Sequence, residues 1–94
     1  MNVRVVTRSS GTTSVTTSAT GSEFVALPAA RALQANLLNY SGTDIEWRIG
    51  TGTPITLKAN MGYTVTGLQN ANNVSLRRVD QSNTPATVQV HFQD

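Results

Sequence analysis

Apolar and polar residues alternate along most of the chain after residue 44, with the period of two that half-buried β-strands show. The last run is the clearest, because every second residue from 86 to 92 is apolar and Thr, Gln and His lie between them. Trp47 likewise lies between two isoleucines, with Glu46 and Arg48 on the opposite side. The pattern predicts strands over 45–49, 55–57, 63–66, 74–79 and 86–92.

Turn residues separate these runs. Glycines and a proline mark 50–54, asparagines mark 70–73, and Asp80 and Pro85 bound a polar loop. Six or seven short strands, with a turn roughly every ten residues, are typical of a sandwich or a small barrel. We therefore predict an all-β fold: a single small antiparallel β-sandwich or jelly-roll-like barrel with an extended N-terminal arm.

The segment 28–38 is ambiguous. Its alanines favour helix by propensity, and Leu33 and Leu37 lie at helical spacing. Pro28 ends the preceding apolar run, because it has no N–H to give to a central strand. Since 37–42 has the pattern of a strand and a turn, we predict a short turn over 28–32 and a strand over about 33–40.

Residues 1–22 differ in character from the rest of the chain. Residues 3–7 alternate well enough to form a strand, and the run that follows is rich in Ser and Thr, with Val15 its one large hydrophobe. That run has too little apolar area to offset its ordering entropy alone. It is either a loose tail or an arm whose β-branched threonines add a strand to a neighbour. We place the compact domain at 23–94.

The composition favours binding to other proteins. Charged residues make up 13% of the chain, against the roughly 25% usual for soluble domains, while Thr, Ser and Asn supply 30 of the 94 residues. Neutral hydrogen-bonding groups cost less to desolvate than charges do. Such a surface suits an assembly protein, and a sugar-binding surface is also compatible with it.

The net charge of +2 comes entirely from Arg4 and Arg8, because 23–94 holds five basic and five acidic residues. Two arginines are too few for a nucleic-acid footprint, so we predict no nucleic-acid partner. The chain has no cysteine, no signal-peptide pattern at its start and no apolar run of membrane-spanning length. We expect no disulfide and no membrane insertion.

No residue pattern indicates catalysis, a metal or a cofactor. His91 is the only histidine and no cysteine stands beside it to complete a metal site. Asp44 and Glu46 lack a partner for acid–base work, and we interpret them as a turn residue and an exposed strand residue. Asp80 opens a loop with too few carboxylates for calcium, so we expect it to cap the turn. The protein is predicted not to be an enzyme.

Arg77 and Arg78 are adjacent, so on a strand they point to opposite faces and one of them turns toward the interior or an interface. A buried arginine needs a carboxylate, and Glu46 and Asp80 are the candidates. Trp47 is either a core residue or a platform for stacking a sugar. The predicted protein-interface residues are Arg4, Arg8, Val15, Arg77 and Arg78.

Three stretches are familiar in combination: 38–48 (LNYSGTDIEWR), 57–65 (LKANMGYTV) and 74–82 (VSLRRVDQS). Together they resemble small β-sandwich structural proteins of tailed-phage virions, over roughly residues 24–92. The resemblance implies a capsid cement or decoration protein, which sits on the assembled shell as a dimer or trimer and bridges capsomers. Such proteins often reach a neighbouring subunit with an N-terminal arm.

The leading hypothesis is therefore a virion structural protein, made in the host cytoplasm, that binds the major capsid protein or another virion protein and forms a homo-oligomer. In this hypothesis the N-terminal arm orders on the shell and its two arginines meet an acidic surface. The alternative is a tail or fibre module that binds a receptor or carbohydrate through Trp47, Tyr40 or Tyr63.

Overall fold

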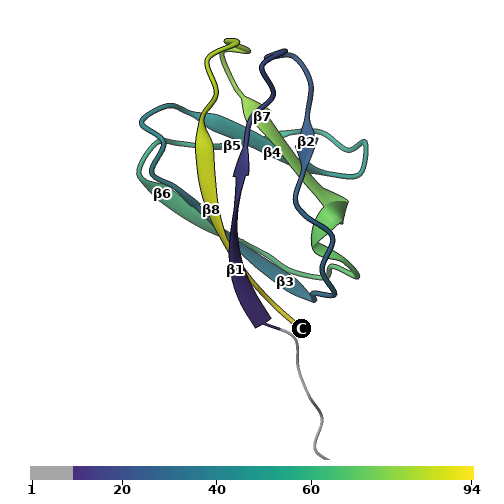
Figure 1. The fold of residues 1–94 in the computed structure, drawn as a ribbon. Coiled ribbons are helices and arrows are strands. Elements are labelled where there is room, and N and C mark those ends of the chain that lie inside the picture. Colours follow the sequence, from purple (N-terminus) through teal and green to yellow (C-terminus); the bar gives the residue numbers. More distant parts are fainter. Residues whose placement is uncertain (1–9) are drawn as a thin grey trace, which may run out of the picture.

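The computed structural model describes residues 10–94, in which eight strands form two four-stranded antiparallel sheets packed face to face (Figure 1). Sheet A has the order β1-β8-β3-β6, and sheet B has the order β2-β7-β4-β5. The strands are β1 (Ser10–Thr16), β2 (Val25–Ala26), β3 (Gln34–Asn39), β4 (Ile45–Ile49), β5 (Ile55–Leu57), β6 (Met61–Val65), β7 (Val74–Arg78) and β8 (Thr87–Gln93), with one short 3-10 helix, η1 (Ala71–Asn73), before β7.

The strand order is that of a jelly roll. The first four strands pair with the last four in reverse: β1 with β8, β2 with β7, β3 with β6 and β4 with β5. Two further pairings, β3 with β8 and β4 with β7, join these ribbons into the two sheets. The predicted all-β sandwich is confirmed, and most predicted strands lie within two residues of their observed bounds.

The core lies between the sheets and follows the alternation in the sequence. Trp47 is 5% exposed, so of the two roles expected for it the place in the core is confirmed. Every second residue of β3, β4, β7 and β8 faces inward, because neighbouring side chains on a strand point to opposite faces. The largest fully buried apolar side chains are Leu27, Leu37, Ile45, Leu76, Val74 and Val88.

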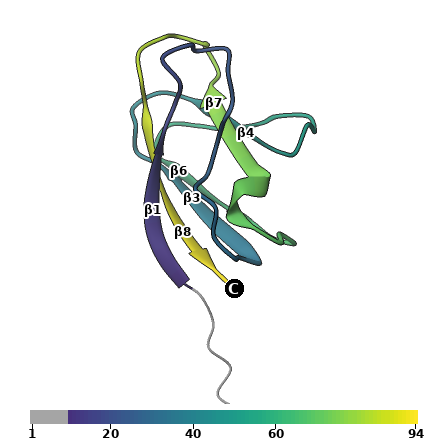
Figure 2. The same cartoon turned by 45° about the vertical axis from the view of Figure 1, so that its right-hand side comes forward.

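The Ser/Thr-rich segment is part of the sandwich. β1 pairs with β8 along its whole length, and the two strands lie side by side in Figures 1 and 2. Val15 faces Val88 and is buried, and the Thr17 hydroxyl accepts a hydrogen bond from the Ala86 N–H at 2.8 Å. The segment was expected to be either a loose tail or a strand added to a neighbour, and residues 10–16 instead add a strand to the chain's own sheet. The domain within 10–94 therefore begins before residue 23.

A close backbone contact fastens the loop after β1. A Cβ at Gly21 would stand 2.1 Å from the Gln81 carbonyl oxygen and 2.3 Å from that of Ser82. Only glycine lets the two backbones approach this closely. The β1–β2 loop is thus held against the β7–β8 loop, which again ties residues 17–22 to the domain.

The ambiguous segment before β3 contains no helix. Ala30 accepts a backbone hydrogen bond from Ala71 and donates its N–H to the Asn70 side chain at 3.1 Å. Asn70 and Asn73 also form a capping box around η1. These contacts from distant residues give the backbone groups of 28–33 partners outside the segment, so local helix propensity does not decide its structure.

Asn39, at the end of β3, has a polar side chain that is fully buried, with 0% exposure. Its amide nitrogen donates to the carbonyls of Thr43 and Leu57, at 2.8 and 2.9 Å. Its amide oxygen accepts from the N–H and the hydroxyl of Ser41. All four hydrogen-bonding positions of the amide are used, and they join the β3–β4 turn to the end of β5.

Candidate functional site

The outward side of sheet A carries no carboxylate, ammonium or guanidinium group on any of its four strands. Register and alternation place thirteen residues on it, and all are neutral hydroxyl or amide residues apart from one glycine, one leucine and one histidine. We call this surface the neutral face. It consists of Ser10, Thr12, Ser14 and Thr16 of β1, Thr87, Gln89, His91 and Gln93 of β8, Gln34, Asn36 and Leu38 of β3, and Gly62 and Thr64 of β6.

Hydrogen bonds cross the strands on the neutral face. Thr64 donates its hydroxyl proton to the Asn36 amide oxygen at 2.6 Å, so the Asn36 nitrogen points to His91 Nδ1, 3.1 Å away. With that amide orientation Nδ1 is the acceptor, and Nε2 carries the ring proton. Thr16 and Thr87 bond hydroxyl to hydroxyl at 3.0 Å. These contacts hold side chains from all four strands in fixed positions.

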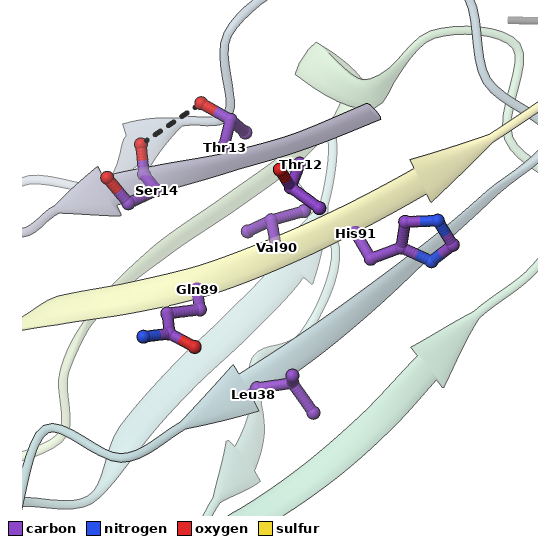
Figure 3. A pocket seen from close by; sticks show the side chains of 7 residues that line it. All are labelled: Thr12, Thr13, Ser14, Leu38, Gln89, Val90 and His91. Atoms are coloured by element: carbon purple, nitrogen blue, oxygen red, sulfur yellow. Dashed lines mark hydrogen bonds between the residues drawn. The ribbon is translucent and has the colours of Figure 1, made fainter. Parts of the chain in front are cut away.

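An open hollow of about 520 Å³ lies on this face between β1, β8 and β3 (Figure 3). Thr12, Ser14, Gln89 and His91 present hydroxyl, amide and imidazole groups, and Leu38 supplies one apolar contact. None of these groups forms a nucleophile–base pair with another. The hollow therefore offers hydrogen bonds to a partner.

The outward side of sheet B is charged. Arg77 pairs with Glu46 at 2.5 Å and donates to the Ser22 carbonyl at 2.8 Å. The guanidinium groups of Arg48 and Arg77 lie 3.8 and 4.3 Å from the centre of the Phe24 ring, which is cation–π distance. This cluster fastens the segment before β2 onto sheet B. Glu46, expected to be an exposed strand residue, is instead half-buried in an ion pair.

Arg78 lies at one end of the sandwich and forms a two-pronged pair with Asp80. Its Nε and Nη2 donate to the two carboxylate oxygens at 2.9 and 2.8 Å, and Nη1 donates to the Thr84 carbonyl. These hydrogen bonds lower the pKa of the Asp80 carboxyl to about 2 and raise the pKa of the Arg78 guanidinium. Asp80 also accepts from the Ser82 N–H, so its predicted capping role is confirmed. Glu46 and Asp80 were the predicted carboxylate partners of Arg77 and Arg78, and both are confirmed.

The predicted interface residues do not form one surface. Arg4 and Arg8 lie outside the described residues. Val15 was predicted as an interface residue, but its side chain is buried in the core of its own chain and is not exposed to a partner. Arg77 and Arg78 lie on sheet B and are occupied by intramolecular carboxylates.

Sequence reasoning missed the neutral face, although its residue types were visible in the Ser/Thr/Asn content. The face exists only because 10–16 pairs with 87–93, and nothing in either segment alone indicates that pairing.

Other candidate residues have structural contacts. The Asp44 carboxylate accepts from the Ala59 N–H at 3.0 Å, at the turn where it was expected.

Within residues 10–94 no three His, Cys, Asp or Glu side chains come together in a way that could hold a metal ion. In the same part of the chain, no helix has the length and apolar character needed to cross a membrane.

Comparison of the chain with protein-family models, with curated proteins and with solved structures finds no match.

Proposed function

We propose that the protein is a non-enzymatic phage virion component, a decoration or cement protein that binds the assembled shell through its neutral face. The observation that carries the proposal is the absence of charged groups from four adjacent strands of sheet A, while sheet B and the loops carry the charges of 10–94. The major capsid protein is the proposed partner.

Desolvation makes the neutral face the better docking surface. A charged group that is buried at an interface needs an opposite charge in good geometry, because losing its water costs several kcal/mol or more. Hydroxyl and amide groups need only one hydrogen-bonding partner each. A sheet face of such groups can meet the edge loops or strands of a shell protein at many points.

The fold supports the proposal by analogy only. Eight-stranded jelly rolls occur in viral capsid proteins and in lectins, and a fold does not by itself specify a function. The proposed contact differs from the arm of the sequence-based hypothesis, since residues 10–22 complete the protein's own sandwich.

The lectin analogy also keeps a receptor- or carbohydrate-binding role as the second candidate. Trp47 is unavailable to stack a sugar, because it is buried. Tyr40 is 63% exposed and Tyr63 is 48% exposed, so these two rings are the remaining platforms.

The test uses particles purified on a density gradient from a phage lysate that contains the protein. We expect the wild-type chain to sediment with the particles. Gln89→Glu, which places a carboxylate in the middle of the neutral face, should lose most of this association. Gln69→Glu is the matched control, because it adds the same charge to an exposed loop residue outside that face.

Wild-type protein that stays in the soluble fraction would overturn the virion proposal. Binding to a glycan array that depends on Tyr40 or Tyr63 would then favour the second candidate. Equal association of both variants would show that the particle is bound through a different surface.

A further inference from the structure

The four edge strands of the two sheets are not equally protected. In sheet B, β2 has only two residues, and the three-residue β5 lies between Pro54 and Lys58. Short length, proline and lysine are the devices by which natural sheets discourage edge pairing. In sheet A, β6 has five residues, Met-Gly-Tyr-Thr-Val, with no proline and no charge. Its outer edge is open to hydrogen bonding with another strand.

Exposed apolar side chains gather beside β6. Met61 is 57% exposed and Tyr63 is 48% exposed, and both lie on the inward side of sheet A, where no further strand covers them. Across the gap Ile55 of β5 is 48% exposed. A mainly apolar hollow of about 300 Å³ runs beside Leu57, Met61 and Tyr63, and Lys58 also lines it. The core of the sandwich is thus incompletely covered along this side.

Trp47 lies directly behind this opening. Its ring centre is 5.1 Å from that of Tyr63, and its buried Nε1–H has no acceptor among residues 10–94. The opposite edge of sheet A lacks such a surface, because the exposed residues of β1 are Ser and Thr. The apolar opening and the unprotected strand edge occur together only at β6.

We propose that a second copy of this chain covers the opening, and that the two β6 strands pair antiparallel to form a two-fold symmetric dimer. The backbone groups of each edge then satisfy those of the other, as in other cases of strand addition. Met61 and Tyr63 of the two copies pack against each other beneath the paired strands. Two sheets A become one continuous eight-stranded sheet.

Charge placement favours an antiparallel second copy. Lys58 is the charged residue nearest to β6 in the sequence, five positions before Tyr63. Because a turn joins Lys58 to Met61 at the start of β6, a two-fold axis near Tyr63 places the two lysines beyond opposite ends of the strand pair. Parallel pairing would bring them side by side, where like charges repel.

The dimer also bears on how the shell is bound, and this inference rests on the proposed function. Adjacent antiparallel strands of one sheet are related by a two-fold axis perpendicular to that sheet. The two neutral faces therefore point to the same side of the dimer and form one surface twice as wide. A shell protein would meet both faces at once.

Thr64 provides the test, because it is exposed in the middle of β6 and its Cβ lies on the outward side of the sheet. The wild-type chain has a mass of 10.0 kDa, and sedimentation equilibrium at tens of micromolar should give twice that value. Thr64→Lys and Thr64→Glu should each be monomeric, since each brings two like charges across the two-fold axis. An equimolar mixture of the two variants should restore the dimer mass, because the charges are then opposite.

Thr12→Lys is the control, since Thr12 is an exposed residue on the other edge strand of the same sheet and its variant should remain dimeric. Circular dichroism of each variant checks that the fold is kept. A monomeric wild type overturns the dimer, as does a Thr64→Lys dimer or a Thr12→Lys monomer. All of these measurements are made without particles, so they can fail or succeed independently of the virion proposal.

Discussion

At the scale of single residues, Asn39 shows how one polar side chain is kept inside an apolar core. Asn39→Asp removes both amide protons, and a carboxyl group can donate one hydrogen bond at most, so at least one of the carbonyls of Thr43 and Leu57 loses its donor. We expect a loss of about 3 kcal/mol in the free energy of unfolding, since buried polar groups without partners cost this much. Urea denaturation measures the loss.

The control for this prediction is Asn72→Asp, because Asn72 is an exposed residue of η1 whose side chain has no hydrogen-bond partner among residues 10–94. It should change the urea midpoint little. Equal midpoints for the Asn39 variant and the wild type would contradict the assignment of the four hydrogen bonds.

At the scale of elements, the β1–β2 loop depends on the absence of a side chain at Gly21. Gly21→Ala forces a Cβ into the backbone carbonyls of Gln81 and Ser82, neither of which can rotate away. We expect a loss of about 2 kcal/mol, as for other overpacked sites. A thermal melt of this variant beside Ser22→Ala, at the exposed next position, measures the effect. A Gly21→Ala melt that matches the Ser22→Ala melt would mean that the two loops are not in contact.

The strands that could be predicted from the sequence are those with an apolar side facing the core. The period of two in β4 and β8 marks Trp47 and Val90 as inward residues without any knowledge of their partners. β1 lacked this signal, because Val15 is its only large hydrophobe and its other residues are Ser, Thr and Gly. It is stabilised by the hydrogen bonds of β8, more than seventy positions away in sequence, and local patterns cannot show such a pairing.

The same limit applied to the candidate site. The ion pairs of Arg77 and Arg78 were predictable, because a buried guanidinium needs a carboxylate and few carboxylates are present. The neutral face was not predictable, since it is assembled from β1, β8, β3 and β6 and no one of these strands is unusual. Its location follows from strand order, which short runs of residues do not determine.

At the scale of the whole molecule, the jelly roll separates two kinds of surface. The outward side of sheet B carries the Arg77–Glu46 ion pair and two arginines stacked on Phe24, so its charged groups are engaged in contacts within the chain. Sheet A faces outward with neutral donors and acceptors and ends in the unprotected β6. The features suited to binding therefore lie together on sheet A, and the fastening contacts lie on sheet B.

This arrangement predicts that the proposed dimer binds a particle more tightly than its monomer does, because the two neutral faces act together. Once one face is bound, the other is held near its site at an effective concentration in the millimolar range, so apparent affinity should rise by about 10²-fold or more. Particles depleted of the protein are titrated with wild type, Tyr63→Lys, and an equimolar mixture of Tyr63→Lys and Tyr63→Glu. Tyr63 lies at the proposed two-fold axis on the inward side of sheet A, so these variants leave the neutral face without a charge. The monomeric variant should bind about 10²-fold more weakly than wild type, and the mixture should recover most of the loss. Equal affinity of monomer and dimer would mean that the shell engages one neutral face at a time, and that pairing through β6 does not serve particle binding.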